Sequence, residues 1–245
     1  MATHCTHKRV CYACVTAGAG CMHVHLPKPL HGWRAFIGEV GIIVLGVLIA
    51  LAADAFIENL NWRHKVRIAD TNMRAEIKLD RTYAAQFAIF EQCSDRMLDR
   101  MTADLISGNT ADLNKLHAIG EPFVTGSWTA TAWEAAVAGQ IGEHMESQRF
   151  LNYAEAFRRS TMMYDVQFRL RDNYAAAMVG RFGLKEPSAV PAEVTAAETL
   201  RRDLRLARAI TGYFIENSDA LQIGPDPSGV ARYQEKARSC IAALS

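Results

Sequence analysis

Residues 36–57 have the sequence FIGEVGIIVLGVLIALAADAFI, and this stretch decides the fold. Only Glu39 and Asp54 are charged, and the centre, residues 40–53, consists entirely of Val, Ile, Leu, Ala and Gly. A helix of about 20 predominantly apolar residues spans the hydrocarbon core of a bilayer. Trp33 and Trp62 flank the stretch, and Trp favours the membrane–water interface. The sequence therefore predicts a transmembrane helix over residues 35–58.

Two other interpretations of this stretch stay open. A cleaved signal peptide would use Ala50-Leu51-Ala52 or Ala53-Asp54-Ala55, which resemble the small-residue sites that precede cleavage, and translation from Met22 instead of Met1 would leave a short basic leader. A buried core helix is the third interpretation, although the run lacks the polar face that such a helix normally has. We favour the anchor because no helix breaker precedes either cleavage site.

One face of the predicted anchor carries small residues. Glu39, Gly46, Ala50 and Ala53 are seven, four and three residues apart and therefore share a face. Small side chains at such spacing let two membrane helices approach closely. We expect this face to mediate helix association, although Gly and Ala are also simply frequent in membrane helices.

Composition excludes some classes of function. The 245 residues suffice for one domain plus an anchor, and 27 basic against 26 acidic residues leave a formal charge of +1. A nucleic-acid-binding protein would show a basic excess, so no nucleic-acid partner is expected. The sequence contains no HExxH, GxSxG, P-loop or GxGxxG motif. It thus predicts neither an enzyme nor a cofactor.

The six cysteines fall into two groups. Cys11, Cys14 and Cys21, with His23, are weak candidate zinc ligands in a Cys/His-rich leader over residues 1–34, which we otherwise expect to be disordered. Cys93 and Cys240 are the only cysteines after the apolar run. If that part is exported, they are a natural disulfide pair, and the alternative is two buried thiols.

Helical periodicity continues after the anchor. Apolar residues at three- and four-residue steps predict one helix to about Ser107, with Gly108 as its end. Further helices are expected over about 131–141, with Thr131 and Glu134 as a capping box, over 146–182, around 191–221 and up to about Ala243. The prediction is an all-α fold, in which the transmembrane helix continues into an antiparallel helical bundle over residues 59–245.

Two tryptophans suggest a site within this bundle. Trp128 and Trp133 flank a short Ala-rich helix and could line a pocket between helices. Packing in the core is the alternative interpretation of the same two residues.

The anchor block, FIGEVGIIVLGVLIALAADAFIENLNWRHKV, resembles the N-terminal region of an uncharacterised family of small bacterial single-pass membrane proteins. The segments around Cys93, Ser127–Ala130 and Phe150–Ala154 are similar as well, so the resemblance extends over most of residues 35–182. It implies an anchored protein with a helical soluble domain and transfers no activity.

These observations together predict a membrane-anchored, non-enzymatic helical-bundle protein of the bacterial cell envelope. Its partners would be the lipid bilayer and a second copy of the chain or another envelope protein. We expect the bacterial inner membrane as its location, with the C-terminal domain in the periplasm. The alternative function is a sensory or small-molecule-binding bundle, with a pocket near Trp128 and Trp133.

Overall fold

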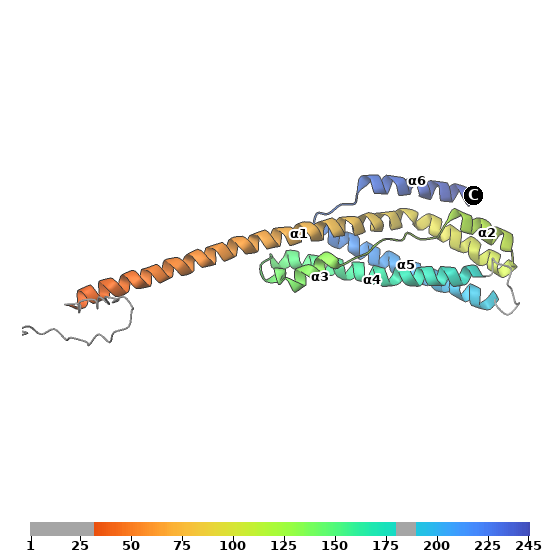
Figure 1. Cartoon of the computed structure of the whole chain (residues 1–245). Helices are drawn as coiled ribbons and strands as arrows, with labels where there is room; N and C mark the ends of the chain where they lie inside the picture. Colours follow the sequence, from red (N-terminus) through yellow and green to blue (C-terminus); the bar gives the residue numbers. More distant parts are fainter. Residues whose placement is uncertain (1–31, 180–189) are drawn as a thin grey trace, which may run out of the picture. The chain divides into compact units, whose positions relative to one another are not determined.

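The computed structural model describes residues 32–179 and 190–245, which contain helices and no strand (Figure 1). The all-α prediction is therefore confirmed for the described part of the chain. In chain order the elements are α1 (Trp33–Ser107), α2 (Thr110–Ile119), α3 (Thr131–Ala138), the 3₁₀ turn η1 (Ile141–Glu143), α4 (Ser147–Met178), α5 (Val190–Ala220) and α6 (Pro227–Ala243).

Two compact units divide the chain, Met1–Asp54 and Ala55–Ser245. In the first unit, the structure describes a stretch of α1 whose side chains are exposed. The second unit holds the rest of α1 and all the other helices. The sequence placed the corresponding boundary after residue 58.

Helix α1 ends where the sequence predicted. Gly108 has a φ of 73°, a left-handed conformation that glycine adopts without the steric cost of a Cβ atom. The Gly108 amide donates to the carbonyl of Leu105, and the Asn109 amide donates to that of Asp104. These bonds satisfy carbonyls that the helix end would otherwise leave without partners.

Contacts between the helices establish their directions. Arg74 bonds to Leu221 and Asp99 pairs with Arg201, so α5 runs antiparallel to α1. Helix α5 is antiparallel to α4 as well, because Asn173 of α4 bonds to Asp203 and Met163 of α4 contacts Thr211. Helix α4 runs in the same direction as α1, because Asp70 contacts Tyr153 and Asp80 contacts Ser160. Helix α6 also runs in this direction, because Gln86 contacts Gly229 and Cys93 is bonded to Cys240.

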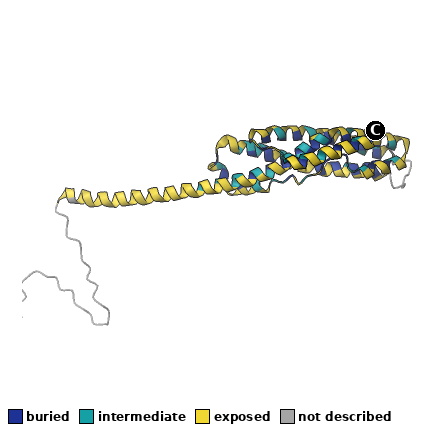
Figure 2. Cartoon of the chain, turned by 90° about the horizontal axis from the view of Figure 1, so that it is seen from above, coloured by how far each residue is buried: buried dark blue, intermediate teal, exposed yellow. Residues whose placement is uncertain are grey.

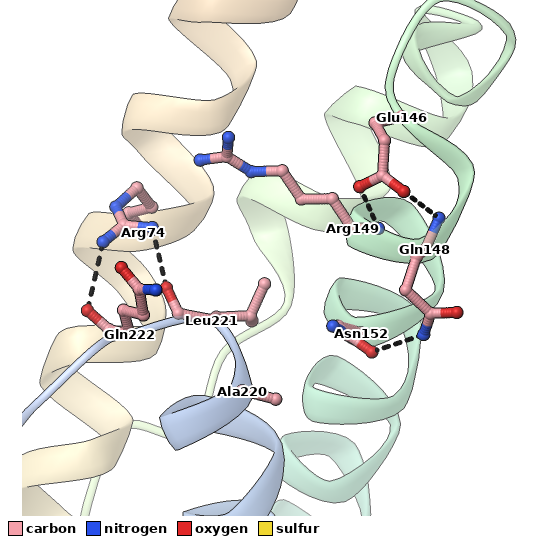
Figure 3. Close-up of a pocket in the computed structure, with 8 residues that line it drawn as sticks. All are labelled: Arg74, Glu146, Gln148, Arg149, Asn152, Ala220, Leu221 and Gln222. Atoms are coloured by element: carbon pink, nitrogen blue, oxygen red, sulfur yellow. Dashed lines mark hydrogen bonds between the residues drawn. The ribbon is translucent and has the colours of Figure 1, made fainter.

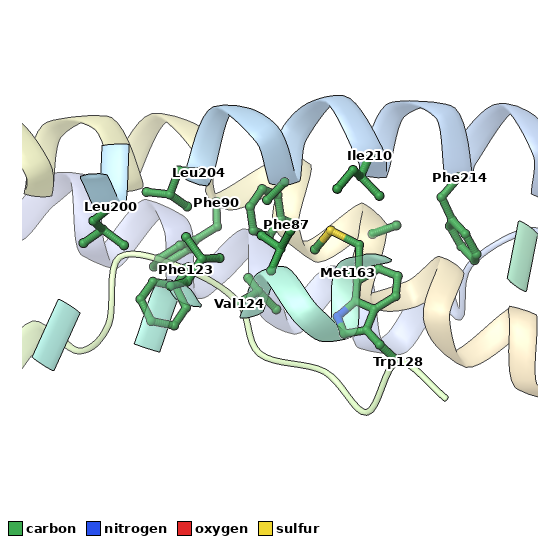
Figure 4. Packing of buried hydrophobic residues seen from close by; sticks show 14 of the residues in the cluster. Phe87, Phe90, Phe123, Val124, Trp128, Met163, Leu200, Leu204, Ile210 and Phe214 are labelled. Atoms are coloured by element: carbon green, nitrogen blue, oxygen red, sulfur yellow. The ribbon is translucent and has the colours of Figure 1, made fainter. Parts of the chain in front are cut away.

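The core of the second unit combines three helices with an irregular segment. Figure 4 shows Phe87 and Phe90 of α1, Met163 of α4 and Phe214 of α5 as members of one cluster of buried side chains. The connection between α2 and α3 also contributes buried side chains to this cluster, namely Phe123, Val124 and Trp128. This connection lets the chain return along the bundle, so that α4 can start beside the middle of α1.

Helix α6 is fixed to α1 along its whole length. Its N-cap Asp226 accepts from the amide of Gly229, and Pro227 occupies the first turn, where a missing N–H costs nothing. A Cβ atom at Gly229 would lie 2.8 Å from the Thr82 methyl group, so only glycine permits this approach. At the other end, the Cys93–Cys240 disulfide joins the two helices.

Candidate functional site

The apolar stretch of α1 is exposed in the part of the chain that the structure describes. Among the described residues, α1 is the one helix that is long and apolar enough to cross a membrane. Its most apolar window has a mean hydropathy of 2.7, and none of that window is buried. Ile42 is 74% exposed and Ile49 61% exposed, and Figure 2 shows this part of the helix exposed on all sides. The buried-core-helix interpretation is therefore wrong, since a core helix would be covered.

The predicted association face is also open. Glu39, Gly46, Ala50 and Ala53 are all exposed. A Cβ atom built on Gly46 would meet nothing within 4 Å. The described part of the chain thus leaves this face available to another helix, and helix association through it stays a prediction.

Within the bundle, three carboxylates of α1 hold the elements that follow it. Glu76 accepts hydrogen bonds from the backbone amides of Thr131 and Ala132, at 3.0 and 2.7 Å, and from the Thr129 hydroxyl. Its carboxylate therefore caps the N-terminus of α3, where the helix dipole favours a negative charge. The predicted capping box is wrong: Ala130 is the N-cap residue and makes no side-chain cap.

Asp80 is the second of these carboxylates, and it is fully buried. Its Oδ2 accepts a 2.6 Å hydrogen bond from the Ser160 hydroxyl, while its Oδ1 has no partner within the described structure. Burial raises the pKa of Asp80 to about 7; the Ser160 hydrogen bond lowers it and the nearby Glu76 raises it. Desolvation dominates because a charge without sufficient partners is costly in the interior.

Asp70, the third carboxylate, joins α1 to the start of α4. It accepts a 2.8 Å hydrogen bond from the Tyr153 hydroxyl and forms a 2.7 Å ion pair with Arg149. Burial, together with this hydrogen bond, raises the pKa of Tyr153 to about 12. Asp70 and Asp80 thus both bind α4 to α1, and Glu76 binds the start of α3 to the same helix.

The two tryptophans that suggested a pocket are packed against other aromatic rings. Trp128 is 2% exposed and lies 5.7 Å from Phe214, ring centroid to ring centroid. Trp133 is half-buried and lies 4.8 Å from Phe150. Neither tryptophan is among the lining residues of the five pockets that we compared in the described part of the chain.

Figure 3 shows one of these pockets, which has a volume of about 270 Å³. Its arginines already have partners. The Arg74 guanidinium donates to the carbonyls of Leu221 and Gln222 at the end of α5, and Arg149 pairs with Asp70. The Glu146 carboxylate caps α4. The pocket is therefore a junction where the start of α4 and the end of α5 meet the middle of α1, and its charged groups are engaged in holding that junction.

A second pocket, of about 560 Å³, lies between α2 and α4 and is lined by both signs of charge. Arg171, Asp172 and Glu121 are at its edge, and the Tyr174 hydroxyl lies 3.1 Å from His117 Nδ1. This mixture of a cation, two carboxylates and neutral polar groups indicates no particular ligand.

The predicted cysteine sites have different outcomes. Cys93 and Cys240 form a disulfide, with Cα atoms 6.0 Å apart. The candidate metal ligands Cys11, Cys14, Cys21 and His23 lie outside the described residues. Among the residues that are described, no group of three or more His, Cys, Asp or Glu side chains is placed to hold a metal ion.

Comparisons with protein-family models, with curated proteins and with solved structures found no match for this chain.

Proposed function

We propose that the chain is a single-pass membrane protein of the bacterial cell envelope, in which a non-enzymatic helical bundle is anchored by residues 36–57 and associates with a second copy. The observation that carries this proposal is the complete exposure of a stretch with a mean hydropathy of 2.7. In water, such a surface would drive aggregation, whereas a bilayer covers it. The resemblance to the uncharacterised family of bacterial membrane proteins is part of the proposal.

The disulfide supports the proposed compartment. Disulfides persist in oxidising compartments such as the bacterial periplasm and are rare in the reducing cytosol. Cys93 and Cys240 lie on the second unit. We therefore assign the bundle to the periplasmic side of the inner membrane.

The polar contacts of the bundle support a scaffold. Asp70, Glu76 and Asp80 are occupied by helix-to-helix contacts. Two arginines of α5 are likewise paired with α1, Arg201 with Asp99 and Arg208 with Asp95. Groups held in this way rigidify the bundle. For the alternative, a small-molecule sensor near Trp128 and Trp133, the described structure has rings packed against Phe214 and Phe150 where the pocket is expected.

Self-association is tested in the full chain, labelled at its C-terminus with a donor or an acceptor fluorophore and reconstituted into vesicles. Gly46→Leu with Ala50→Leu places bulk on the predicted face. Gly41→Leu with Ala52→Leu makes the same two exchanges on the opposite side of the helix, since a residue advances by about 100°.

We expect energy transfer between wild-type copies, its loss in the first double variant and its retention in the second. Absence of transfer between wild-type copies, or equal loss in both variants, would overturn the proposed association. Recovery of the wild-type chain in the soluble fraction after vesicle flotation would overturn the anchor itself.

A further inference from the structure

The segment of α1 that follows the apolar stretch is cationic. Residues 58–69 contain Arg63, Lys65 and Arg67 against one carboxylate, Glu58. Asp70, the next acidic residue, is already neutralised by Arg149. We call Arg63, Lys65 and Arg67 the cationic ring.

The charges of the cationic ring are available. All three side chains are exposed, and none has a carboxylate partner within the described structure. The Lys65 ammonium group lies 4.4 Å from the centre of the Trp62 ring, an interaction that leaves its positive charge uncompensated. Other arginines, namely Arg81, Arg149 and Arg208 of the bundle, are by contrast paired with carboxylates.

The arrangement around the helix indicates what kind of partner fits. At 3.6 residues per turn, Arg67 lies about 40° from Arg63, whereas Lys65 lies about 200° away. The ring therefore presents charge in nearly opposite directions. A protein partner would cover one side of a helix, but a layer of lipid headgroups surrounds it.

The level of the ring along the helix fits the same partner. With a rise of about 1.5 Å per residue, Arg63 lies about 9 Å beyond Ile57, the last residue of the apolar stretch. Helical side chains lean toward the N-terminus of their helix, so Arg63 and Lys65 extend back toward Ile57. Trp62 lies at the same level, stacked on His144 with ring centroids 3.7 Å apart. Trp is enriched at this interface, and long basic side chains extend into it.

We propose that the cationic ring binds the phosphates of anionic phospholipids in the leaflet that faces the bundle. This inference rests on the proposed membrane anchoring. An arginine guanidinium can form two parallel hydrogen bonds to one phosphate, and the lysine adds a point charge. The ring thereby recruits anionic lipids around the exit of α1 and fixes the depth of the helix in the membrane.

The test uses the full chain in phosphatidylcholine vesicles that contain a trace of spin-labelled phosphatidylglycerol or spin-labelled phosphatidylcholine. The immobilised fraction of each spin label reports which lipid lies at the protein surface. The variant carries Arg63→Gln, Lys65→Gln and Arg67→Gln. A control variant with the same loss of charge carries Arg96→Gln, Arg202→Gln and Arg205→Gln, three exposed bundle residues that have no ion pair within the described structure.

We expect the wild type and the control to prefer phosphatidylglycerol by about fivefold, the factor that corresponds to one basic residue near an anionic surface. The ring variant should show a preference near unity. A preference that persists in the ring variant, or that falls equally in the control, would overturn the proposal while the anchor stands. Absence of an immobilised component for both lipids would instead overturn the anchor, and the lipid site with it.

Discussion

Replacing Asp80 with Asn should remove a large part of the pH dependence of the stability of the bundle. Asp80 is fully buried, bonds to Ser160 at 2.6 Å and has one oxygen without a partner. Asn has the same shape and carries no charge at any pH. Its amide oxygen can still accept the Ser160 hydroxyl, so the substitution removes the ionisation and keeps the packing.

The magnitude follows from the raised pKa of Asp80. The folded protein keeps the proton up to about pH 7, whereas the unfolded chain releases it near the ordinary value of 3.8. Between these values the native state binds more protons than the unfolded state, so the free energy of unfolding falls as the pH rises. From about pH 5 to about pH 8 the loss amounts to about 3 kcal/mol. Below pH 3.8 both states are protonated, and the effect disappears.

The assay is urea unfolding of the full chain in detergent at about pH 5 and about pH 8, followed by tryptophan fluorescence, to which the buried Trp128 contributes. The measured quantity is the difference between the two free energies of unfolding, compared between wild type and variant. Asp165→Asn is the control, because Asp165 is an exposed carboxylate on α4. Other titrating groups contribute equally to all three proteins and cancel.

We expect the free energy of unfolding of the wild type to fall by about 3 kcal/mol more than that of Asp80→Asn between the lower and the higher pH. Asp165→Asn should follow the wild type at both. If Asp80→Asn instead destabilised the protein by the same amount at both pH values, the carboxylate would be ionised in the folded state, and the reasoning from burial would be refuted.

Three further changes test the contacts of the bundle, each by denaturant unfolding followed by circular dichroism. Glu76→Gln removes one of the two acceptors at the start of α3 and should cost about 1 kcal/mol; an unchanged midpoint would show that water caps the helix equally well. Cys93→Ser with Cys240→Ser should cost about 5 kcal/mol in the chain-entropy model for a separation of 147 residues, and a loss below about 1 kcal/mol would contradict that contribution. Trp128→Ala should cost about 3–5 kcal/mol because the ring is 2% exposed, whereas a ring lining an open pocket would cost far less.

Local signals explain why the helices could be predicted from the sequence. Gly108 ends α1 because its backbone adopts a positive φ, and Pro227 starts α6 because a first helical turn tolerates proline. The apolar steps through Met73, Ile77, Phe87 and Phe90 matched side chains that are buried in the structure. Each of these signals depends on residues close together in the chain.

The polar contacts between helices could not be predicted from such local signals, because the two residues of each contact are far apart in the sequence. Glu76 caps a helix that begins 55 residues later, and Asp80 meets Ser160 across 80 residues. One signal was available: position 80, three residues after Ile77, continues the apolar stripe and yet holds an aspartate. A charged residue on a buried face indicates a contact within the protein, although it does not identify the partner.

The central claim is that residues 36–57 hold the intact chain in the membrane, and one measurement tests it most directly. Membranes from cells that express the C-terminally tagged chain are washed with alkaline carbonate, and the intact mass of the tagged protein is determined in pellet and supernatant. We predict a protein in the pellet whose mass includes residues 36–57. A shorter protein in the supernatant, cut after Ala52 or Ala55, would contradict the claim and establish a cleaved signal peptide.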